Sequence, residues 1–479
     1  EFGVSIVELA RLEPAPGPDP APPATRATRV PGWVLVTLVA IGAALRLLWS
    51  TTFGLSFDET FTAMAGRRSL GNLFDFLSHQ DSHPPLDYLL RLPLARAGAG
   101  DLAFRAPSVV FSVAALALFA WWMRDRGWAG AVATGLLAVS GFEIAYGGEA
   151  RMYALLQLIG IAVAVIAEAW LVTPRRWHTW AVGGLVFVGL CDHVSVALLA
   201  VGLFALAGIR RDRAAWRWRA GVVAGGVGWA AVWGTSFLTQ ARVHHPSWIP
   251  LTTLDGVLDV VAGHVTYTDG VRLVVLAAIA AGAVCLARRG GPLFQVWVVC
   301  GVVPFALAAT VGVFTPFFLD RTVTAEAWAP VLAVGFLVDA AARRWRPLGI
   351  TAAVAVVLVA LPGTLTMLGG TWFYDLTIEQ LGRSARPGDV VAVTPAWYGP
   401  LTDWRVGVRS EIGPATPSPV PIDETDSFRL TGARATGRVW LVEYGSSRPS
   451  LAGYVKCGPT WTHGETTLLC LEPRQPHPE

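Results

Sequence analysis

The sequence predicts an all-α polytopic membrane protein followed by a small α/β domain, and three observations lead to this fold class. Of the 479 residues, 53% are hydrophobic and only 15% are charged, whereas soluble domains carry about a quarter charged residues. The apolar residues form long runs, and a helix that crosses a bilayer needs about 20 of them. After residue 370 these runs stop, and shorter segments typical of strands follow.

Apolar runs separated by short polar connections are the pattern of a multi-pass membrane protein. The length rule predicts about eleven transmembrane helices, which together form a domain at 33–370. The expected helices cover residues 33–52, 105–123, 127–145, 150–172, 178–194, 195–209, 219–240, 271–287, 293–313, 324–342 and 347–369.

Arginine placement orients these helices. Arginine-rich connections alternate along the chain, at 124–127, 174–176, 210–219, 287–290 and 343–346. The positive-inside rule places all of them in the cytoplasm of a plasma (inner) membrane. By the same alternation the N-terminal arm 1–32 is cytoplasmic, and its Pro- and Ala-rich composition predicts disorder. Everything after residue 370 is then extracytoplasmic.

Two extracytoplasmic segments are long enough to have structure of their own. The connection at 53–104 contains, from His83, "HPPLDYLLRLPLARAGAG"; its apolar part is too short to span, and we expect a helix lying in the membrane interface. Residues 371–479 predict a small extracytoplasmic α/β domain. Cys457 and Cys470 lie in this domain, and in an oxidising compartment they would be able to form a disulfide.

Ionisable residues gather at the predicted outer ends of the helices. A charge in or at the edge of the bilayer costs several kcal/mol without a partner, so such residues suggest a function. The group consists of Asp58, Glu59, His83, Arg105, Glu143, Glu149, Arg151, Asp192, His193, Asp320, Arg321 and Glu326. This one-sided distribution predicts a cleft that opens outward at the membrane boundary.

Several of these residues also have a purely structural explanation. Asp58 and Glu59 could cap the helix that follows them, because acids favour helix N-termini. Glu149 and Arg151 could pair with each other at a helix end. Arg321 could extend toward lipid head groups.

The histidines allow similar alternatives. His83 precedes two prolines and could be a turn residue, and Asp192 with His193 could form an interfacial polar cap. Metal ligation by these three side chains stays open, but no HxxxH or CxxC spacing supports it. We therefore expect no metal site from spacing alone.

Six short motifs occur in order between residues 33 and 370. They are "FDET" (57–60), "HPPLDYLL" (83–90), "FRAPSVVFSVAAL" (104–116), "GGEARMYALLQL" (147–158), "CDHVS" (191–195) and "FLDRTVTAEAWAP" (318–330). Together they resemble the GT-C superfamily of membrane glycosyltransferases. The branch they are similar to holds the protein O-mannosyltransferases and the lipid A aminoarabinose transferases (glycosyltransferase family 39-like). The last two motifs depart from the family pattern, since Val194 and Thr322 stand where relatives carry Tyr.

The resemblance implies a GT-C fold and an integral membrane glycosyltransferase. Such an enzyme moves a sugar from a polyprenyl-phosphate donor to a hydroxyl acceptor at the outer membrane face. By resemblance Asp58 is the catalytic base, and Glu59 shares that role or holds acceptor hydroxyls. The departing phosphate needs a fixed cation, and the candidates are, in order, Arg321, Arg151 and Arg105.

The remaining expectations concern supporting residues and substrates. His83, where some relatives carry Lys, would assist at the phosphate, Glu149 would orient Arg151, and Tyr153 and His193 would support the site. Direct displacement would invert the anomeric centre. No cofactor is expected to be required, although a divalent cation (Mg or Mn) stays open. Mannose is the favoured sugar among several, the acceptor is a glycan, lipid or protein, and no nucleic acid is expected.

Two other functions compete with this one. A transporter or flippase of a lipid-linked sugar would also gather charges in a membrane cavity, but it would place them near mid-membrane with access to both faces. A non-catalytic scaffold, with a C-terminal domain that binds cell-wall glycan, would leave the outer acids unexplained.

Overall fold

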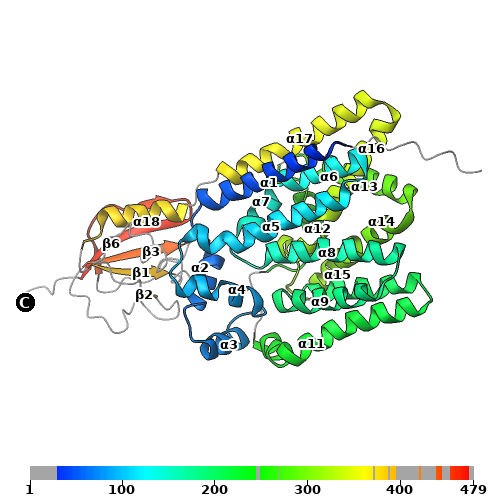
Figure 1. The fold of residues 1–479 in the computed structure, drawn as a ribbon. Coiled ribbons are helices and arrows are strands. Elements are labelled where there is room, and N and C mark those ends of the chain that lie inside the picture. The colour runs from blue at the N-terminus through cyan, green and yellow to red at the C-terminus, as the bar shows by residue number, and fades with distance from the viewer. Residues whose placement is uncertain are drawn as a thin grey trace, which may run out of the picture.

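The computed structural model joins a large bundle of helices to one small sheet (Figure 1). It describes residues 30–243, 249–268, 270–369, 373–386, 389–394, 420–421, 438–444 and 454–473. Most of the predicted N-terminal arm, residues 1–29, therefore lies outside the described residues. The main apolar core runs through the bundle. It consists of buried hydrophobic side chains contributed by helices between Ala115 and Ala360.

Six helical segments of the described chain are long and apolar enough to cross a membrane. They are α1 (Gly32–Thr52), α5 (Asp101–Met123), α8 (Tyr153–Val172), α11 (Arg213–Val243), the continuous run of α14 (Gly291–Val296), η3 (Trp297–Val302) and α15 (Val303–Phe314), and α17 (Arg346–Gly369). The chain is thus a multi-pass membrane protein by length and composition.

Two further spans are bent. Helices α6 (Gly127–Val139) and α7 (Gly141–Gly148) meet at 55°, and η4 (Asp320–Glu326) and α16 (Trp328–Arg344) meet at 58°. If each bent pair is one span, up to eight helices of the described chain meet the criteria.

The expected eleven is higher than this count, for a physical reason. Each of the eleven predicted runs is helical, but α9 (Arg176–Asp192) and α10 (Val196–Leu206), which continues into η2 (Ala207–Ile209), are short. Helix α13 (Arg272–Arg289) has sufficient length but carries three arginines.

The bend between α6 and α7 is held by an arginine from a neighbouring helix. Arg46 of α1 is fully buried and donates hydrogen bonds to the carbonyls of Leu137 (3.1 Å) and Ala138 (3.2 Å), at the end of α6. It also donates to the hydroxyl of Ser112 at 2.6 Å. Since the last carbonyls of a helix have no partners within that helix, Arg46 satisfies two acceptors that the bend would leave unpaired.

Two acids, one on α8 and one on α16, are paired with arginines. Glu168 accepts from Arg126 at 2.5 Å, and Asp339 accepts from Arg289 at 2.9 Å and from Arg343 at 2.8 Å. Arg126 lies close enough to Arg289 for their charges to interact. We call this part of the bundle the arginine-rich end.

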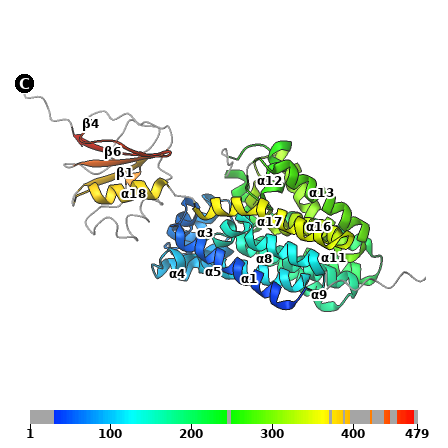
Figure 2. The ribbon, with the colours of Figure 1, turned by 90° about the horizontal axis from the view of Figure 1, so that it is seen from above.

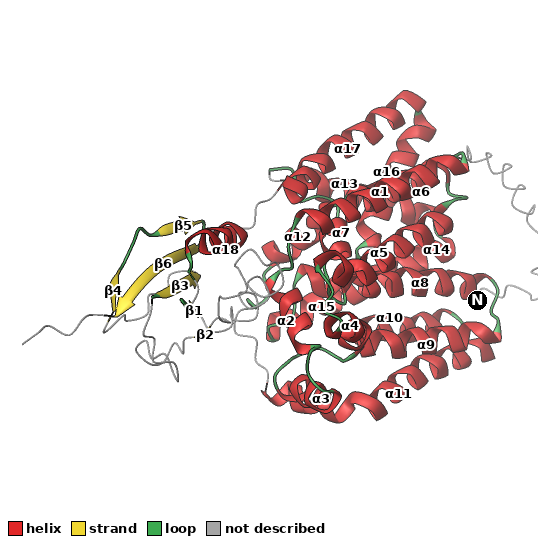
Figure 3. Ribbon diagram, turned by 60° about the vertical axis from the view of Figure 1, so that its left-hand side comes forward, coloured by secondary structure: helices red, strands yellow, loops and turns green. Residues whose placement is uncertain are grey.

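The long connection at 53–104 forms three short helices, not one. They are α2 (Phe57–Ala65), α3 (Leu70–His79) and α4 (Leu86–Arg96). The expected interfacial helix corresponds to α4, and α2 and α3 add to it. Another short helix, α12 (Leu254–Gly263), precedes α13. Figure 3 shows α2 and α12 toward the part of the bundle that faces the sheet.

The C-terminal residues form a sheet with one helix against it. The strands are β1 (Val390–Thr394), β2 (Val420–Pro421), β3 (Val439–Tyr444), β4 (Tyr454–Lys456), β5 (Trp461–His463) and β6 (Thr466–Pro473). Their order is β2-β1-β3-β6-β4, with β5 also paired to β6; β1 is parallel to β2 and β3, and β6 is antiparallel to its partners. Leu441 of β3 pairs with Ala392 on one side and Leu469 on the other.

Helix α18 (Phe373–Ser384) covers this sheet with Ile378 and Leu381. Phe57, the first residue of α2, packs against the same core. The sheet therefore lies at the end of the bundle where Asp58 is found. Figure 2 shows from above that the sheet and α18 lie beyond the end of the bundle that carries α3 and α4. We call this end of the bundle the Asp58 end.

Cys457 and Cys470 form a disulfide in this part of the chain. We predict that a polar maleimide will not label them until a reductant is added. The measurement requires a background in which Cys191, Cys285 and Cys300, the free cysteines of the described chain, are replaced by Ala. Immediate labelling of that variant without reductant would contradict the disulfide.

Candidate active site

The local sequence around Ser56 places Asp58 in the first turn of α2. Ser56 is the N-cap: its hydroxyl accepts from the backbone N–H of Glu59 at 3.4 Å, and its own N–H donates to Glu59 Oε2 at 2.6 Å. This reciprocal capping box fixes the start of a helix. Helix capping was the structural explanation considered for Asp58 and Glu59. In the structure, Glu59 is the acid that takes part in the capping box.

Glu59 forms a fully buried ion pair with Arg105 of α5. Its Oε1 accepts from Arg105 Nε and from the backbone N–H of Ala150, each at 2.6 Å, and its Oε2 accepts from Arg105 Nη2 at 2.5 Å. Burial opposes the charged form, but Arg105 and the backbone donors hold the pKa of the Glu59 carboxyl below its usual value. Both oxygens are thus engaged by the protein itself.

Arg105 is equally engaged on its other side. Its guanidinium donates to the carbonyls of Ser50 (3.2 Å), Phe53 (2.5 Å) and Gly54 (2.8 Å), where the chain leaves α1. The pair therefore joins α1, α2, α5 and the segment before α8. These contacts favour a structural role for Glu59 and Arg105 over the catalytic and phosphate-binding roles expected from the motifs.

Asp58 lies differently from its neighbour. Its Oδ2 forms an ion pair with Arg321 Nη1 at 3.1 Å, and the two side chains are 30% and 24% exposed. The structure thus brings together the first and last motifs, which are 263 residues apart. This pair combines an accessible carboxylate with an accessible guanidinium.

Arg151 lies beside this pair and is buried. Its Nη1 donates to the hydroxyl of Thr62 at 2.7 Å and to the backbone carbonyl of Asp58 at 3.4 Å, and it also lies 3.4 Å from the hydroxyl of Tyr88. Its Nη2 is 3.4 Å from His83 Nδ1. Arg151 therefore connects α2, α4 and the loop that carries His83.

His83 is held by residues that the sequence did not single out. Its Nδ1 lies 2.8 Å from Asp81 Oδ1, and Tyr88 donates a hydrogen bond to the other oxygen of Asp81. Although burial opposes ionisation, His83 above all holds the pKa of Asp81 below its usual range. The signal was present in the sequence, since Asp81 lies two residues before His83 and Tyr88 belongs to the "HPPLDYLL" motif.

His193 approaches the same group from α9, which ends at Asp192. Its ring centroid lies 5.9 Å from that of His83, and its Nδ1 is 2.8 Å from the hydroxyl of Ser195. His193 is buried, and its ring packs against that of His83.

Asp320, next to Arg321, joins three segments. Its Oδ2 accepts from the hydroxyls of Tyr146 (3.0 Å) and Tyr267 (2.9 Å), and its Oδ1 accepts from the backbone N–H of Arg321 at 2.7 Å. The predicted supporting residue Tyr153 lies against Tyr146, with ring centroids 5.1 Å apart. Asp320 thereby fixes the backbone that carries the Arg321 guanidinium.

Glu149 contacts the N-cap residue of α2 and precedes Arg151 in the chain. Its Oε1 accepts from the Ser56 hydroxyl at 3.1 Å, and its backbone carbonyl accepts from the N–H of Arg151 at 2.8 Å. Burial raises the pKa of Glu149 to about 8, and the negative charges of Glu59 and Asp58 add to this effect. The raised pKa favours the protonated form of Glu149.

Taken together, the site offers one accessible carboxylate beside a set of positive and hydroxyl-bearing side chains. That combination can take a proton from a hydroxyl and bind a phosphate. In the described part of the chain, no group of three or more His, Cys, Asp or Glu side chains could hold a metal ion.

The buried pair gives a stability prediction. Replacing Arg105 by Met leaves the Glu59 carboxylate buried without its cation, and losing one partner of a buried pair costs about 3–5 kcal/mol. We expect a clear drop in the thermal unfolding midpoint of the purified protein. The control is Arg383→Met, which removes the partner of Glu379 from an exposed pair on α18. Equal midpoints for the two variants would contradict the role given to Arg105.

Glu149 gives a pH prediction. The pKa of Glu149 is raised from 4.5 to about 8 in the folded protein, so the folded state holds this proton more tightly than the unfolded state does. The resulting contribution to stability is complete below pH 4.5 and is lost as the pH rises to about 8. The unfolding midpoint of the unmodified protein should therefore fall between pH 5 and 8 more steeply than that of Glu149→Gln. The exposed Glu379→Gln serves as control. Parallel pH profiles for Glu149→Gln and the unmodified protein would show that the pKa of Glu149 is not raised.

Comparisons with known proteins give the fold an independent test. A scan against protein-family models finds no match, and a search of curated proteins finds none either. The chain is similar to two crystal structures of ArnT from Cupriavidus metallidurans, one bound to undecaprenyl phosphate and one in the apo state. Both have a TM-score of 0.58 and cover 92% of this chain and 98% of ArnT, at 15% and 14% identity.

An oligosaccharyltransferase from Archaeoglobus fulgidus, solved in complex with Zn and sulfate, aligns with a TM-score of 0.48 and 9% identity, over 86% of this chain and 68% of its own. The ArnT alignments extend over nearly the whole of both chains. At such low identity they establish architecture, and that architecture is the one the motifs predicted. This chain is a multi-pass membrane protein with the GT-C fold.

Proposed function

We propose that this protein is a membrane glycosyltransferase that moves a sugar from a polyprenyl-phosphate donor to a hydroxyl acceptor. The observation that carries the proposal is the ion pair between Asp58 and Arg321, 3.1 Å apart and partly exposed. A carboxylate that can accept a proton lies beside a guanidinium that can bind a phosphate, and the proposed reaction needs both.

Asp58 is the base in this proposal. A hydroxyl is a poor nucleophile, and a carboxylate within hydrogen-bond reach takes its proton as attack begins. The acceptor oxygen then forms a bond to the anomeric carbon, and the bond from that carbon to the phosphate oxygen breaks. The electron pair leaves with the phosphate, and a single displacement inverts the anomeric centre.

Arg321 and Arg151 stabilise the departing phosphate. Arginine keeps its charge and matches phosphate geometry, and fixed cations are most effective where negative charge develops. An arriving donor phosphate would compete with Asp58 for Arg321. Donor binding would thus free the Asp58 carboxylate to accept a proton.

The other site residues have positioning roles in this scheme. Glu59 and Arg105 hold the first turn of α2, and Asp81 holds His83 near Arg151. This departs from the motif-based expectation that Glu59 shares the base role and that Arg105 binds the phosphate. The departure rests on the burial of both side chains.

Support for the donor class comes from the ArnT structure that contains undecaprenyl phosphate. The motif likeness favours mannose, and the transferred group is a hexose or a pentose. The contrast between the arginine-rich end and the Asp58 end supports an orientation of the protein in the membrane. In it, the Asp58 end and the C-terminal domain, residues 371–479, are extracytoplasmic. The arginine-rich end and the N-terminus are then cytoplasmic.

Asp58→Asn tests the base. We predict that this variant loses about 10²- to 10⁴-fold in the rate of sugar transfer from a polyprenyl-phosphate mannose in membranes, because the amide cannot take the proton. Asp75→Asn, an exposed substitution on α3, should leave the rate unchanged. Transfer by Asp58→Asn at the unmodified rate would exclude Asp58 as the base.

Arg321→Gln tests the cation. We predict a loss of about 10²-fold in kcat/KM for the lipid donor, since one charge that stabilises the leaving phosphate is gone. Arg344→Gln, at the other end of the bundle, is the matched control. Unchanged donor kinetics in Arg321→Gln would transfer the phosphate role to Arg151.

A further inference from the structure

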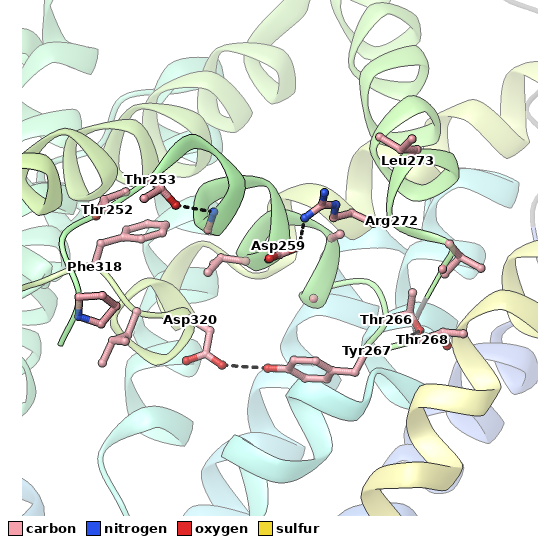
Figure 4. A pocket seen from close by; sticks show the side chains of 18 of the residues that line it. Thr252, Thr253, Asp259, Thr266, Tyr267, Thr268, Arg272, Leu273, Phe318 and Asp320 are labelled. Atoms are coloured by element: carbon pink, nitrogen blue, oxygen red, sulfur yellow. Dashed lines mark hydrogen bonds and ion pairs between the residues drawn. The ribbon is translucent and has the colours of Figure 1, made fainter. Parts of the chain in front are cut away.

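A cavity of about 860 Å³ is lined in part by Asp320, the residue next to Arg321 in the chain. Its walls come from α12 and the segments on both sides of it, from the start of α13, and from Phe318, Leu319 and Asp320 where η4 begins (Figure 4). A cavity of this size accommodates a ligand of several sugar rings or a sugar with an apolar group. The donor chemistry proposed above does not use it.

The cavity adjoins the site through Asp320. This carboxylate forms part of the wall and receives the hydrogen bond from Tyr267, another wall residue (Figure 4). The next residue along the chain is Arg321, whose guanidinium contacts Asp58. A ligand in the cavity would therefore lie one residue along the chain from the arginine proposed to bind the donor phosphate.

The charges of the cavity oppose an anionic ligand. Among the described residues that line it, the ionisable side chains with formal charge at neutral pH are Asp259, Asp320 and Arg272. Arg272 already contacts two carboxylates, Asp259 at 2.6 Å and Asp255 at 2.8 Å. The lining and its ion-pair partner Asp255 thus carry three acids and one base, and like charges repel a phosphate.

The uncharged lining suits a hydroxyl-rich ligand with an apolar part. Hydroxyl groups come from Tyr267 and from four threonines, and apolar surface comes from leucines and an aromatic ring. These residues are Thr252, Thr253, Thr266, Thr268, Leu251, Leu273 and Phe318. Hydroxyls and carboxylates hydrogen-bond to sugar hydroxyls, while aliphatic and aromatic groups cover the apolar faces of a sugar or an alkyl chain.

We propose that this cavity is the acceptor subsite and that it takes a neutral, hydroxyl-rich glycoside with an apolar part. The inference rests on the proposed function, because it assigns the second substrate of the same reaction. The positive group at Arg321, Arg151 and His83 receives the anionic donor, and the acidic cavity receives the neutral acceptor. The two substrates are sorted by charge and meet at Asp58.

A binding experiment tests the subsite. Saturation-transfer difference NMR on the full chain in lipid nanodiscs would compare hexyl glucoside with hexyl phosphate, and empty nanodiscs would correct for partition into lipid. Gly256→Phe fills the cavity, since a Cβ at Gly256 meets only the Thr253 hydroxyl at 3.4 Å. It should weaken hexyl glucoside binding by about 10-fold or more. The control is Gly226→Phe on α11, where a Cβ meets nothing within 4 Å.

The outcomes are separable from those for the proposed function. Binding of hexyl glucoside in Asp58→Asn should equal that of the unmodified protein, whatever that variant does to catalysis. Equal binding by Gly256→Phe and the unmodified protein would overturn the inference. So would a parallel loss of hexyl phosphate binding in Gly256→Phe, because the cavity would then bind anions.

A gain of binding tests the charge argument without relying on a damaged protein. In the double variant Asp255→Asn, Asp259→Asn, Arg272 loses both carboxylates and the cavity becomes less negative. Hexyl phosphate should then bind about 5-fold or more tightly than to the unmodified protein, since opposite charges attract. No gain in hexyl phosphate binding would overturn the assignment of the cavity to neutral ligands.

Discussion

The buried ion pair between Glu59 and Arg105 is the constraint on which the rest of the site depends. It holds the first turn of α2 against the end of α1, against α5 and against the backbone of Ala150. A buried pair is favourable only when its remaining hydrogen-bonding groups are satisfied, and here backbone N–H and carbonyl groups satisfy both partners. Asp58, one residue earlier, is thereby held at the surface of this group.

Charged side chains are distributed unevenly in this protein, both between the two ends of the bundle and within the Asp58 end. Between the two ends of the bundle, acids at the arginine-rich end are neutralised by pairs such as that of Glu168 with Arg126, whereas the Asp58 end keeps a partly exposed pair. Within the Asp58 end, Asp320 lines an acidic cavity, and the next residue, Arg321, belongs to the basic side chains around Asp58. In the proposed reaction, this arrangement would let an anionic lipid donor and a neutral acceptor bind to different surfaces near Asp58.

Much of the fold was predictable from the sequence, because a hydrophobic run long enough to form a membrane helix is a local feature of the chain. The motifs also brought Asp58 and Arg321 into one hypothesis, and the structure places them in contact. What the sequence did not indicate depends on tertiary contacts. The break between α6 and α7 is stabilised by Arg46 from another helix, and the burial that separates Glu59 from Asp58 cannot be read from two adjacent acids.

The most direct test is a structure of Asp58→Asn with a bound polyprenyl-phosphate sugar, determined by electron cryo-microscopy in nanodiscs. The account predicts phosphate oxygens within hydrogen-bonding distance of the Arg321 guanidinium. It also predicts that the side chain of residue 58 faces the anomeric carbon on the side opposite the phosphate. A phosphate bound among the arginines at the other end of the bundle, or residue 58 on the same side as the leaving oxygen, would contradict it.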